Sequence, residues 1–319
     1  MGRNVTMADA TTAQLRSAQA SPSVLALAAG PMRATVRPLD GGRIASFWRE
    51  EPSGHRTDLL VPMPEAAYDP AIWPKAGSYP LVPYSNRIRD AAFRFGETRV
   101  ELAPHPAAAP HALHGFSQMR PWTVARQAAA QIEMRYRHDP QNDPSGWPWA
   151  FEAVQLITLG PSGLTHEIGV ESRADSAMPM GLGVHPYFAV SQGDRIRFTA
   201  DALWEADADG CGKQRLRLSG SARQYDSGHG EKDITSYYAG WDGNAWIQRH
   251  DGTQIAIQTS APLDHLVFHV PAGGRYLCLE PVSHVADAFN LAAAGQPETG
   301  MRVLNPGEAL RATVRIGVA

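Results

Sequence analysis

A histidine and a glutamate close two strand-like segments and have the chemistry of an acid–base pair. The first segment, residues 181–188, reads Gly-Leu-Gly-Val-His-Pro-Tyr-Phe and places His185 before Pro186. The second, residues 276–283, reads Tyr-Leu-Cys-Leu-Glu-Pro-Val-Ser and places Glu280 at the end of an apolar run. Apolar surroundings raise the pKa of a carboxyl group toward neutrality. We therefore predict that His185 acts as a general acid and Glu280 as a general base.

The residues around His185 are expected to fix its pose. Pro186 favours an extended backbone at the preceding histidine, and Gly181 and Gly183 are expected to leave open space beside the imidazole. A purely structural role stays open for each residue. His185 could be a core histidine bonded to the backbone, and Glu280 could be an exposed carboxylate at a strand end.

Two upstream clusters supply candidate ligand-binding residues. Arg87 follows Asn86, and its forked donors suit sugar hydroxyls or a ring oxygen. Asn86 either contacts ligand or supports the loop. His114 precedes Gly115, which permits close approach of a ligand; His111 is the weaker candidate. The alternatives are a salt bridge for Arg87 and a backbone-bonded loop histidine for His114.

No motif predicts a metal or a cofactor. Residues 205–210 resemble the start of a calcium loop, but the twelfth position is Leu216 instead of glutamate. His265, His269 and His284 lack the spacing or the cysteine partners of a zinc site. The chain also contains no P-loop and no nucleophile elbow. We expect neither metal nor cofactor.

Composition excludes several classes of partner. The chain has 319 residues and a formal net charge of −3, so no basic field attracts nucleic acid or an acidic membrane. Cys211 and Cys278 are too few for a disulfide framework, and Cys278 is expected to be a buried small hydrophobe. No apolar stretch is long enough to span a bilayer. We expect a cytoplasmic protein in which residues 1–22 form a loose extension and 23–319 a single catalytic domain.

The elements that must position these residues read as strands. Total Gly is 29 and Pro is 25, which disfavours long helices. Ile132, Met134 and Tyr136 alternate with charged residues, a period typical of a strand with one wet face. We predict an all-β fold of mostly antiparallel strands in two packed sheets, with few or no long helices. The expected strands include 33–37, 92–102, 131–138, 151–159, 164–171, 195–200, 254–258, 265–270 and 309–318.

These clusters, in this order, resemble the aldose 1-epimerase family, also called galactose mutarotases, and are closest to a bacterial branch. The likeness covers roughly residues 24–318. It rests on Gly-Val-His-Pro-Tyr-Phe, Leu-Glu-Pro-Val-Ser, Asn86-Arg87-Ile88, His114-Gly115-Phe116 and Asp287-Ala288-Phe289-Asn290. The resemblance implies a β-supersandwich and interconversion of the α and β anomers of a free, galactose- or glucose-like monosaccharide.

The same resemblance assigns roles and exposes one departure. It makes His185 the acid, Glu280 the base, and Arg87 and His114 ligands of the sugar. The family usually carries an aspartate for sugar hydroxyls before a Phe-x-Gly-Trp-like segment. Here that position falls on Thr235, while Asp233 and Asp242 are the acidic residues that a shifted alignment would choose.

Three other functions remain open at this stage. A non-catalytic carbohydrate-binding module would use Arg87 and an aromatic platform such as Trp122 or Trp241. A glycoside hydrolase or lyase would need a second carboxylate beside Glu280, from Glu152, Glu171 or Asp264. An epimerase of phosphorylated hexoses would use Arg89 and Arg120 as extra cations. The protein is expected to be a monomer or a homodimer.

Overall fold

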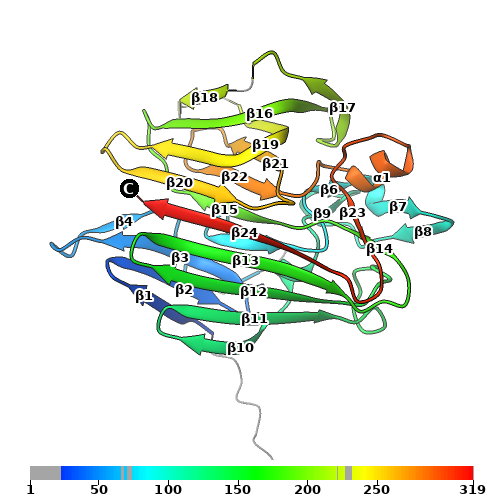
Figure 1. The fold of residues 1–319 in the computed structure, drawn as a ribbon, viewed down its shortest axis with the longest axis horizontal. Coiled ribbons are helices and arrows are strands. Elements are labelled where there is room, and N and C mark those ends of the chain that lie inside the picture. Colours follow the sequence, from blue (N-terminus) through cyan, green and yellow to red (C-terminus); the bar gives the residue numbers. More distant parts are fainter. Residues whose placement is uncertain (1–22, 66–67, 70–73, 221, 227–231, 319) are drawn as a thin grey trace, which may run out of the picture.

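Strands make up most of the protein, as the alternating sequence pattern predicted. The computed structural model describes residues 23–65, 68–69, 74–220, 222–226 and 232–318. Eighteen of the strands join one continuous sheet, and every strand pairing recorded within it is antiparallel. Figure 1 shows this sheet curving so that its two halves face each other. The predicted extension, residues 1–22, lies outside the described residues.

One half of the sheet runs from the N-terminal strands to the strands that carry the acid–base candidates. Each strand pairs with the next in the following order: β1 (Leu25–Ala29), β2 (Met32–Arg37), β3 (Arg43–Glu50), β5 (Ser78–Leu81), β15 (Gly183–Phe188), β22 (Leu277–Val282) and β21 (His265–Val270), with β4 (Arg56–Asp58) also on β3.

The other half is built from longer strands. Its pairing order is β10 (Thr123–Ala128), β11 (Gln131–His138), β12 (Phe151–Gly160), β13 (Gly163–Ser172), β24 (Ala309–Val318), β20 (Gln254–Thr259) and β19 (Ile234–Gln248). Beyond β19 lie β16 (Arg195–Ala206), β17 (Gly212–Arg217) and β18 (Ala222–Asp226).

Strand β19 joins the two halves. Its first part, from Ile234 to Ala239, pairs with β21, and its last part, from Asn244 to Gln248, pairs with β20. Gly240 and Gly243 lie between these parts with φ of 62° and 81°. Only glycine adopts this left-handed region without a steric penalty, so the two glycines allow the strand to change partners.

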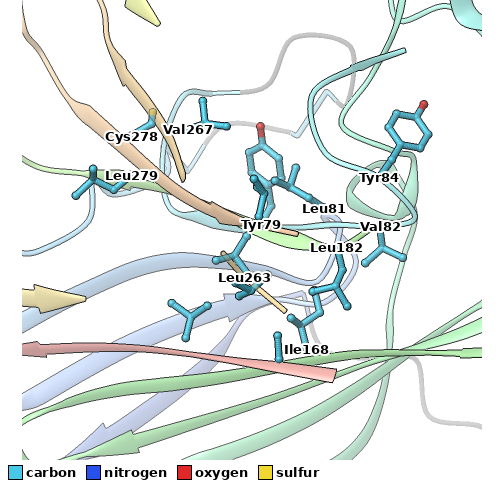
Figure 2. Packing of buried hydrophobic residues seen from close by; sticks show 14 of the residues in the cluster. Tyr79, Leu81, Val82, Tyr84, Ile168, Leu182, Leu263, Val267, Cys278 and Leu279 are labelled. Carbon is cyan, nitrogen blue, oxygen red and sulfur yellow. The ribbon is translucent and has the colours of Figure 1, made fainter. Parts of the chain in front are cut away.

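The core fills the space between the halves. Ile132, Met134 and Tyr136 of β11 are buried, which confirms the predicted period of two. In Figure 2, Ile168 of β13 lies near Leu182 and Leu263, while the hydroxyl of Tyr79 points away from Ile168. The layer of aliphatic side chains therefore separates the long strands from the side of the sheet that carries Tyr79.

Three small two-stranded sheets and a few short helices surround one end of the main sheet. They are β6 (Arg87–Ile88) with β9 (Ala112–Leu113), β7 (Ala92–Phe95) with β8 (Thr98–Glu101), β14 (Met178–Met180) with β23 (Arg302–Leu304), the 3-10 helices Arg89–Ala91 and Ser117–Met119, and α1 (Ala288–Ala293). Rings of Tyr84, Phe93, Trp147, Trp149 and Phe289 pack together beneath them. This cluster supports the loop that carries Asn86 and Arg87.

Two expectations about the elements can be compared with the structure. The single strand predicted over residues 92–102 is wrong, because Gly96, with φ of 57°, turns it into the hairpin of β7 and β8. The scarcity of helix is confirmed within the described residues, where α1 has six residues. None of the helices in this part of the chain has the length and apolar character needed to cross a bilayer.

Candidate active site

The pairing of β15 with β22 brings His185 and Glu280 together. The register that joins Gly183 to Val282 and Tyr187 to Cys278 places His185 opposite Glu280, with both side chains on one face of the sheet. His185 Nε2 lies 3.2 Å from Glu280 Oε1, and the two side chains are only 6% and 4% exposed. Two residues about a hundred positions apart thus form one buried pair.

Aromatic rings fix the pose of the His185 imidazole. Tyr79 of β5 stacks on it at a centroid distance of 4.7 Å, and Tyr187 stacks at 4.5 Å. The Tyr187 hydroxyl also lies 3.4 Å from His185 Nε2. These contacts, together with Pro186, hold the imidazole with Nε2 toward Glu280.

The glycines near the site serve packing instead of ligand access, which corrects the sequence interpretation. A Cβ at Gly181 would lie 1.8 Å from His284 Cδ2, and one at Gly183 would lie 2.6 Å from the Pro281 carbonyl oxygen. A Cβ at Gly115 would lie 2.2 Å from the Val82 carbonyl oxygen. Each glycine is required because neighbouring protein atoms occupy the space that was expected to hold a ligand.

Asn86 and His114 hold each other in strained loops. Both residues have left-handed backbones, with φ of 55° and 60°, a conformation that is uncommon outside glycine and often marks functional sites. The Asn86 backbone N–H donates to His114 Nδ1 at 3.2 Å, and the His114 backbone N–H donates to the Asn86 carbonyl at 2.8 Å. In the neutral imidazole the proton is therefore on Nε2, so His114 offers a hydrogen-bond donor.

The loop that resembled a calcium site holds an arginine. Arg89 pairs with Asp207, with Asp209 at 3.0 Å and with Asp287 at 3.7 Å. The carboxylates of this loop, Asp207 and Asp209, are therefore bound to an arginine side chain. The same loop brings Gly210 against the guanidinium of Arg87, where a Cβ would lie 3.1 Å from Arg87 Nη1. The loop therefore backs Arg87 at the site.

A cavity of about 210 Å³ gathers most of the predicted residues. His185, Glu280, Asn86, Arg87 and His114 all line it. The complete lining adds residues that no motif singled out or that the sequence left ambiguous: Lys75, Ala107, Leu113, Tyr187, Thr235, Val267, His269 and Tyr276. A larger hollow of about 510 Å³ lies over β12, β13 and β24, but its glutamates and arginines mostly pair with one another.

Thr235 lines the cavity, and the two predicted aspartates do not. Asp233 is exposed and accepts a hydrogen bond from the Ala272 backbone N–H at 2.7 Å. Asp242 is exposed in the bend of β19 and accepts one from the Asn244 backbone N–H at 2.9 Å. Neither Asp233 nor Asp242 lines this cavity, so the structure does not bring these two candidates for sugar binding together with the other predicted residues.

Two of the lining residues that sequence reasoning missed are His269 and Lys75. The β19–β21 register pairs Thr235 with His269, and Thr235 Oγ lies 2.9 Å from His269 Nδ1. The histidine spacing of 265 and 269 was noticed, but only as a weak zinc signal. Lys75 has a left-handed backbone with φ of 56° and belongs to no recognisable motif. Nothing local in the sequence points to it.

Burial shifts the acid–base pair in opposite directions. It raises the pKa of Glu280 to about 8, although the charges of Lys75 and Arg87 act to lower it. Burial also lowers the pKa of His185 well below 6.5, and His114 and Lys75 lower it further. Both shifts favour the neutral form of each group, so a proton shared by the pair is favoured on Glu280 over His185. Transfer of that proton across the 3.2 Å contact gives the charged form, with His185 protonated and Glu280 ionised.

The residues around the His185–Glu280 pair do not provide what a glycoside hydrolase or a carbohydrate-binding module would need there. Glu280 is the one carboxylate among the described residues that line the cavity; Glu152, Glu171 and Asp264 lie elsewhere. Trp122 and Trp241 are buried and donate to the carbonyls of Ser117 and Asn244, so neither forms an aromatic platform there.

The cations proposed for a phosphorylated hexose are engaged elsewhere. Arg120 pairs with Asp143 at 2.8 Å, and Arg89 lies in the aspartate cluster, so neither lines the cavity.

Cys278 completes the buried face of β22, as its predicted burial required. Its side chain is fully buried, and burial raises the pKa of the thiol well above 9. Its Sγ, His185 and Glu280 offer ligand atoms within 4.8 Å of one another. His265, His269 and His284 do not gather, since their partners are Asp264, Thr235 and the Ser85 backbone N–H respectively.

Known proteins with this sequence pattern and fold identify the family. A family model described as aldose 1-epimerase matches residues 24–317. The uncharacterised protein YphB of Escherichia coli K12 is 27% identical over 297 residues, covering 87% of this chain and 93% of the relative. The crystal structure of a putative aldose 1-epimerase from the same organism superposes with a TM-score of 0.78 at 25% identity, covering 93% of this chain and 98% of the other.

A second solved structure extends the likeness. A galactose mutarotase-like protein of Clostridium acetobutylicum has a TM-score of 0.77 at 18% identity, covering 93% of this chain and 95% of the other, which indicates a shared fold. The family match spans both halves of the sheet and every strand that lines the cavity. The chain therefore belongs to the aldose 1-epimerase family of isomerases.

Proposed function

We propose that the protein interconverts the α and β anomers of an aldose by opening and closing the sugar ring, with His185 as general acid and Glu280 as general base. The observation that carries the proposal is the buried contact of 3.2 Å between these two side chains at a cavity. The C1 hydroxyl and the ring oxygen are bonded to the same carbon. Two groups at hydrogen-bond distance from each other are therefore suitably placed to reach both oxygens.

The reaction needs two proton transfers and no external reagent. Glu280 removes the proton of the C1 hydroxyl while His185 delivers one to the ring oxygen; the bond from C1 to the ring oxygen breaks and C1 becomes an aldehyde. Rotation about C1–C2 presents the other face of the aldehyde. Closure then returns one proton to His185 and takes one from Glu280, so the pair regains its starting state. Each positioned transfer contributes roughly 10²–10⁴-fold.

The remaining lining residues suit the binding of the sugar. Arg87 and His114 line the cavity beside the pair and are of a chemical type that binds sugar oxygens, while the stacked rings of Tyr79 and Tyr187 shield the His185 imidazole from water. Asn86 holds both neighbours in place, because it bonds His114 and its Oδ1 accepts from the Arg87 backbone N–H at 2.9 Å. These side chains position the sugar while the pair moves protons.

Polarimetry of freshly dissolved α-D-galactose and α-D-glucose tests the proposal. The protein is expected to accelerate the approach to anomeric equilibrium, and Glu280→Gln is expected to lower the enzymatic rate by at least about 100-fold. His185→Asn should have a similar effect. Unchanged rates in both variants, with folding verified by circular dichroism, would remove the assignment.

A further inference from the structure

We propose that Arg43 is a positioning residue for the reaction and that its buried positive charge acts on His185 through the ring of Tyr79. This inference rests on the proposed anomer exchange and adds to it a residue that does not line the described cavity. It follows from a row of side chains that crosses the sheet and ends at the acid–base pair.

The strand register places Arg43, Tyr79 and His185 in one row. Tyr79 of β5 is paired with His185 of β15. On the other side of β5, Ile44 of β3 pairs with Ser78, so their neighbours Arg43 and Tyr79 are opposite each other as well. Opposite residues on antiparallel strands share one face of a sheet. The Tyr79 ring therefore lies between the guanidinium, whose Cζ is 4.3 Å from the ring centroid, and the imidazole, whose centroid is 4.7 Å away.

Arg43 brings a full positive charge into the interior of the protein. Its side chain is completely buried, and its Nη2 donates to Gln118 Oε1 at 3.3 Å and to the Tyr68 hydroxyl at 3.2 Å. Nε and Nη1 have no hydrogen-bond partner among the described residues. A guanidinium over an aromatic face is attracted by the electrons of the ring, most strongly where water is excluded. The Tyr79 ring thus holds Arg43 on one side and packs against the imidazole on the other.

A cation on one side of Tyr79 opposes a second cation on the other side. An imidazolium at His185 would be a second positive charge against the same ring, in surroundings sheltered from water where like charges repel strongly. Burial is the main cause of the lowered pKa of His185, and the charge of Arg43 contributes to it. A histidine that holds its proton weakly is the stronger acid toward the ring oxygen of the sugar.

Other titratable and charged groups also face His185, and they come from several elements. They are Glu280 and Cys278 of β22, His269 of β21, the loop residues Lys75 and His114, and the stacked rings of Tyr79 and Tyr187. Arg43 acts from outside the cavity, so its removal changes the charge near His185 and leaves the side chains that a sugar would contact in place.

NMR titration of the histidine side chains tests the effect on His185 without any sugar. The His185 signal is the one that His185→Asn removes. Arg43→Met should raise the pH at which His185 takes up a proton by at least about 0.5 pH unit, and Arg43→Lys, which keeps the charge, should raise it less. Arg43→Gln is neutral and retains hydrogen-bonding groups, so it provides the same test should Arg43→Met not fold.

Arg249→Met is the matched control for the loss of a buried arginine. The Arg249 guanidinium donates to the backbone carbonyls of Asp58 and Ala189 and does not line the described cavity. Its replacement removes a buried charge of the same kind from a place without contact to Tyr79. The protonation of His185 should therefore be unchanged in Arg249→Met.

Polarimetry over a range of pH shows whether the effect reaches the reaction. Arg43→Met should lower kcat by about threefold to tenfold, because the proton donor is weaker and less firmly held, and should change KM by less than about twofold. The acid limb of the profile of kcat/KM against pH should move to higher pH, in step with the NMR titration. Arg249→Met should leave both the limb and the ratio of kcat to KM unchanged.

The outcomes separate this inference from the proposed function. A His185 that takes up its proton at the same pH in the neutral Arg43 variants as in the parent, or an equal shift in Arg249→Met, overturns the role of Arg43 and leaves the anomer exchange intact. An acid limb that stays in place overturns it as well. A parent protein that accelerates no sugar overturns the proposed function, while the NMR titration still decides whether Arg43 acts on His185.

Discussion

Two histidine–carboxylate pairs lie on either side of β22, and only one of them is sealed, that is, has both side chains buried from solvent. His185 and Glu280 meet at 3.2 Å with side chains 6% and 4% exposed. His265 meets its neighbour Asp264 at 2.7 Å, but the Asp264 side chain is 51% exposed. The contacts are chemically alike, and the difference is whether water reaches the carboxylate.

The pKa values of the two carboxyl groups, Asp264 and Glu280, are shifted in opposite directions. Burial alone would raise the pKa of Asp264, but the hydrogen bond and charge of His265 outweigh it and the pKa is lowered. At Glu280 burial prevails and raises the pKa to about 8. The exposed carboxyl group therefore favours its charged form, and the buried one favours its neutral form. The comparison predicts different consequences for the same substitution at the two sites.

The largest contrast is expected in activity. His185→Gln should lower the rate of anomer exchange by at least about 100-fold, because the proton donor for the ring oxygen is lost. The matched variant His265→Gln should change the rate by less than about threefold, since His265 does not line the cavity. The measurement is polarimetry at pH 7 with folding checked for both proteins. Equal losses of rate in the two variants would show that the His185–Glu280 pair has no particular role in the reaction.

The pH dependence of kcat/KM should report the single proton of the sealed pair. As the pH rises through about 8, Glu280 in the free protein loses that proton and no proton remains for the ring oxygen, so activity should fall about tenfold per pH unit above it. On the acid side activity should persist below pH 6.5, because the pKa of His185 is lowered. His265→Gln should keep the same profile. A rate that stays flat from pH 7 to 10 contradicts this shared-proton state.

The smallest expected contrast is in the free energy of unfolding, where removing the charge of Glu280 and removing that of Asp264 should have opposite signs. The raised pKa of Glu280 gives stability that is complete below its unfolded pKa of about 4.5 and is lost as the pH rises through about 8. Glu280→Gln should therefore gain stability relative to the parent between pH 5 and pH 8, by roughly 1–3 kcal/mol. The lowered pKa of Asp264 stabilises above its unfolded pKa, so Asp264→Asn should lose about 0.5 kcal/mol at pH 7, the scale of an exposed pair.

Urea unfolding of the three proteins at pH 5 and pH 8 measures both changes. Asp264→Asn should lose the same amount at the two values, because the Asp264 carboxyl is ionised at both. If the free energy of unfolding of Glu280→Gln, relative to the parent, does not rise between pH 5 and pH 8, then Glu280 is ionised in the folded protein at both pH values.

The sequence predicted the parts of the site that local chemistry determines. His185 and Glu280 stand in strand-end motifs, and antiparallel pairing brings the two side chains within 3.2 Å of each other. Asn86, Arg87 and His114 were found for the same reason, since each lies in a short polar cluster between apolar segments. The alternating pattern likewise predicted the all-β fold, and the position of the turn at Gly96 was its main error.

Long-range packing determined what the sequence could not predict. Thr235 was one of three choices until the β19–β21 register placed it beside His269. Lys75 reaches the cavity from a loop whose backbone conformation no propensity predicts. Gly181 proved to be required by His284, about a hundred residues away in the chain. In each case the deciding atom belongs to a distant segment.

The position of β24 has a consequence for how the protein is made. This strand, Ala309–Val318, lies between β13 and β20 in the interior of the sheet and not at its edge. On the ribosome, one edge of β13 and one edge of β20 therefore emerge unpaired, because β24, their shared partner, follows both of them in the chain. The nascent chain cannot close its sheet before residues 309–318 leave the exit tunnel, and until then these exposed strand edges are natural targets for chaperones.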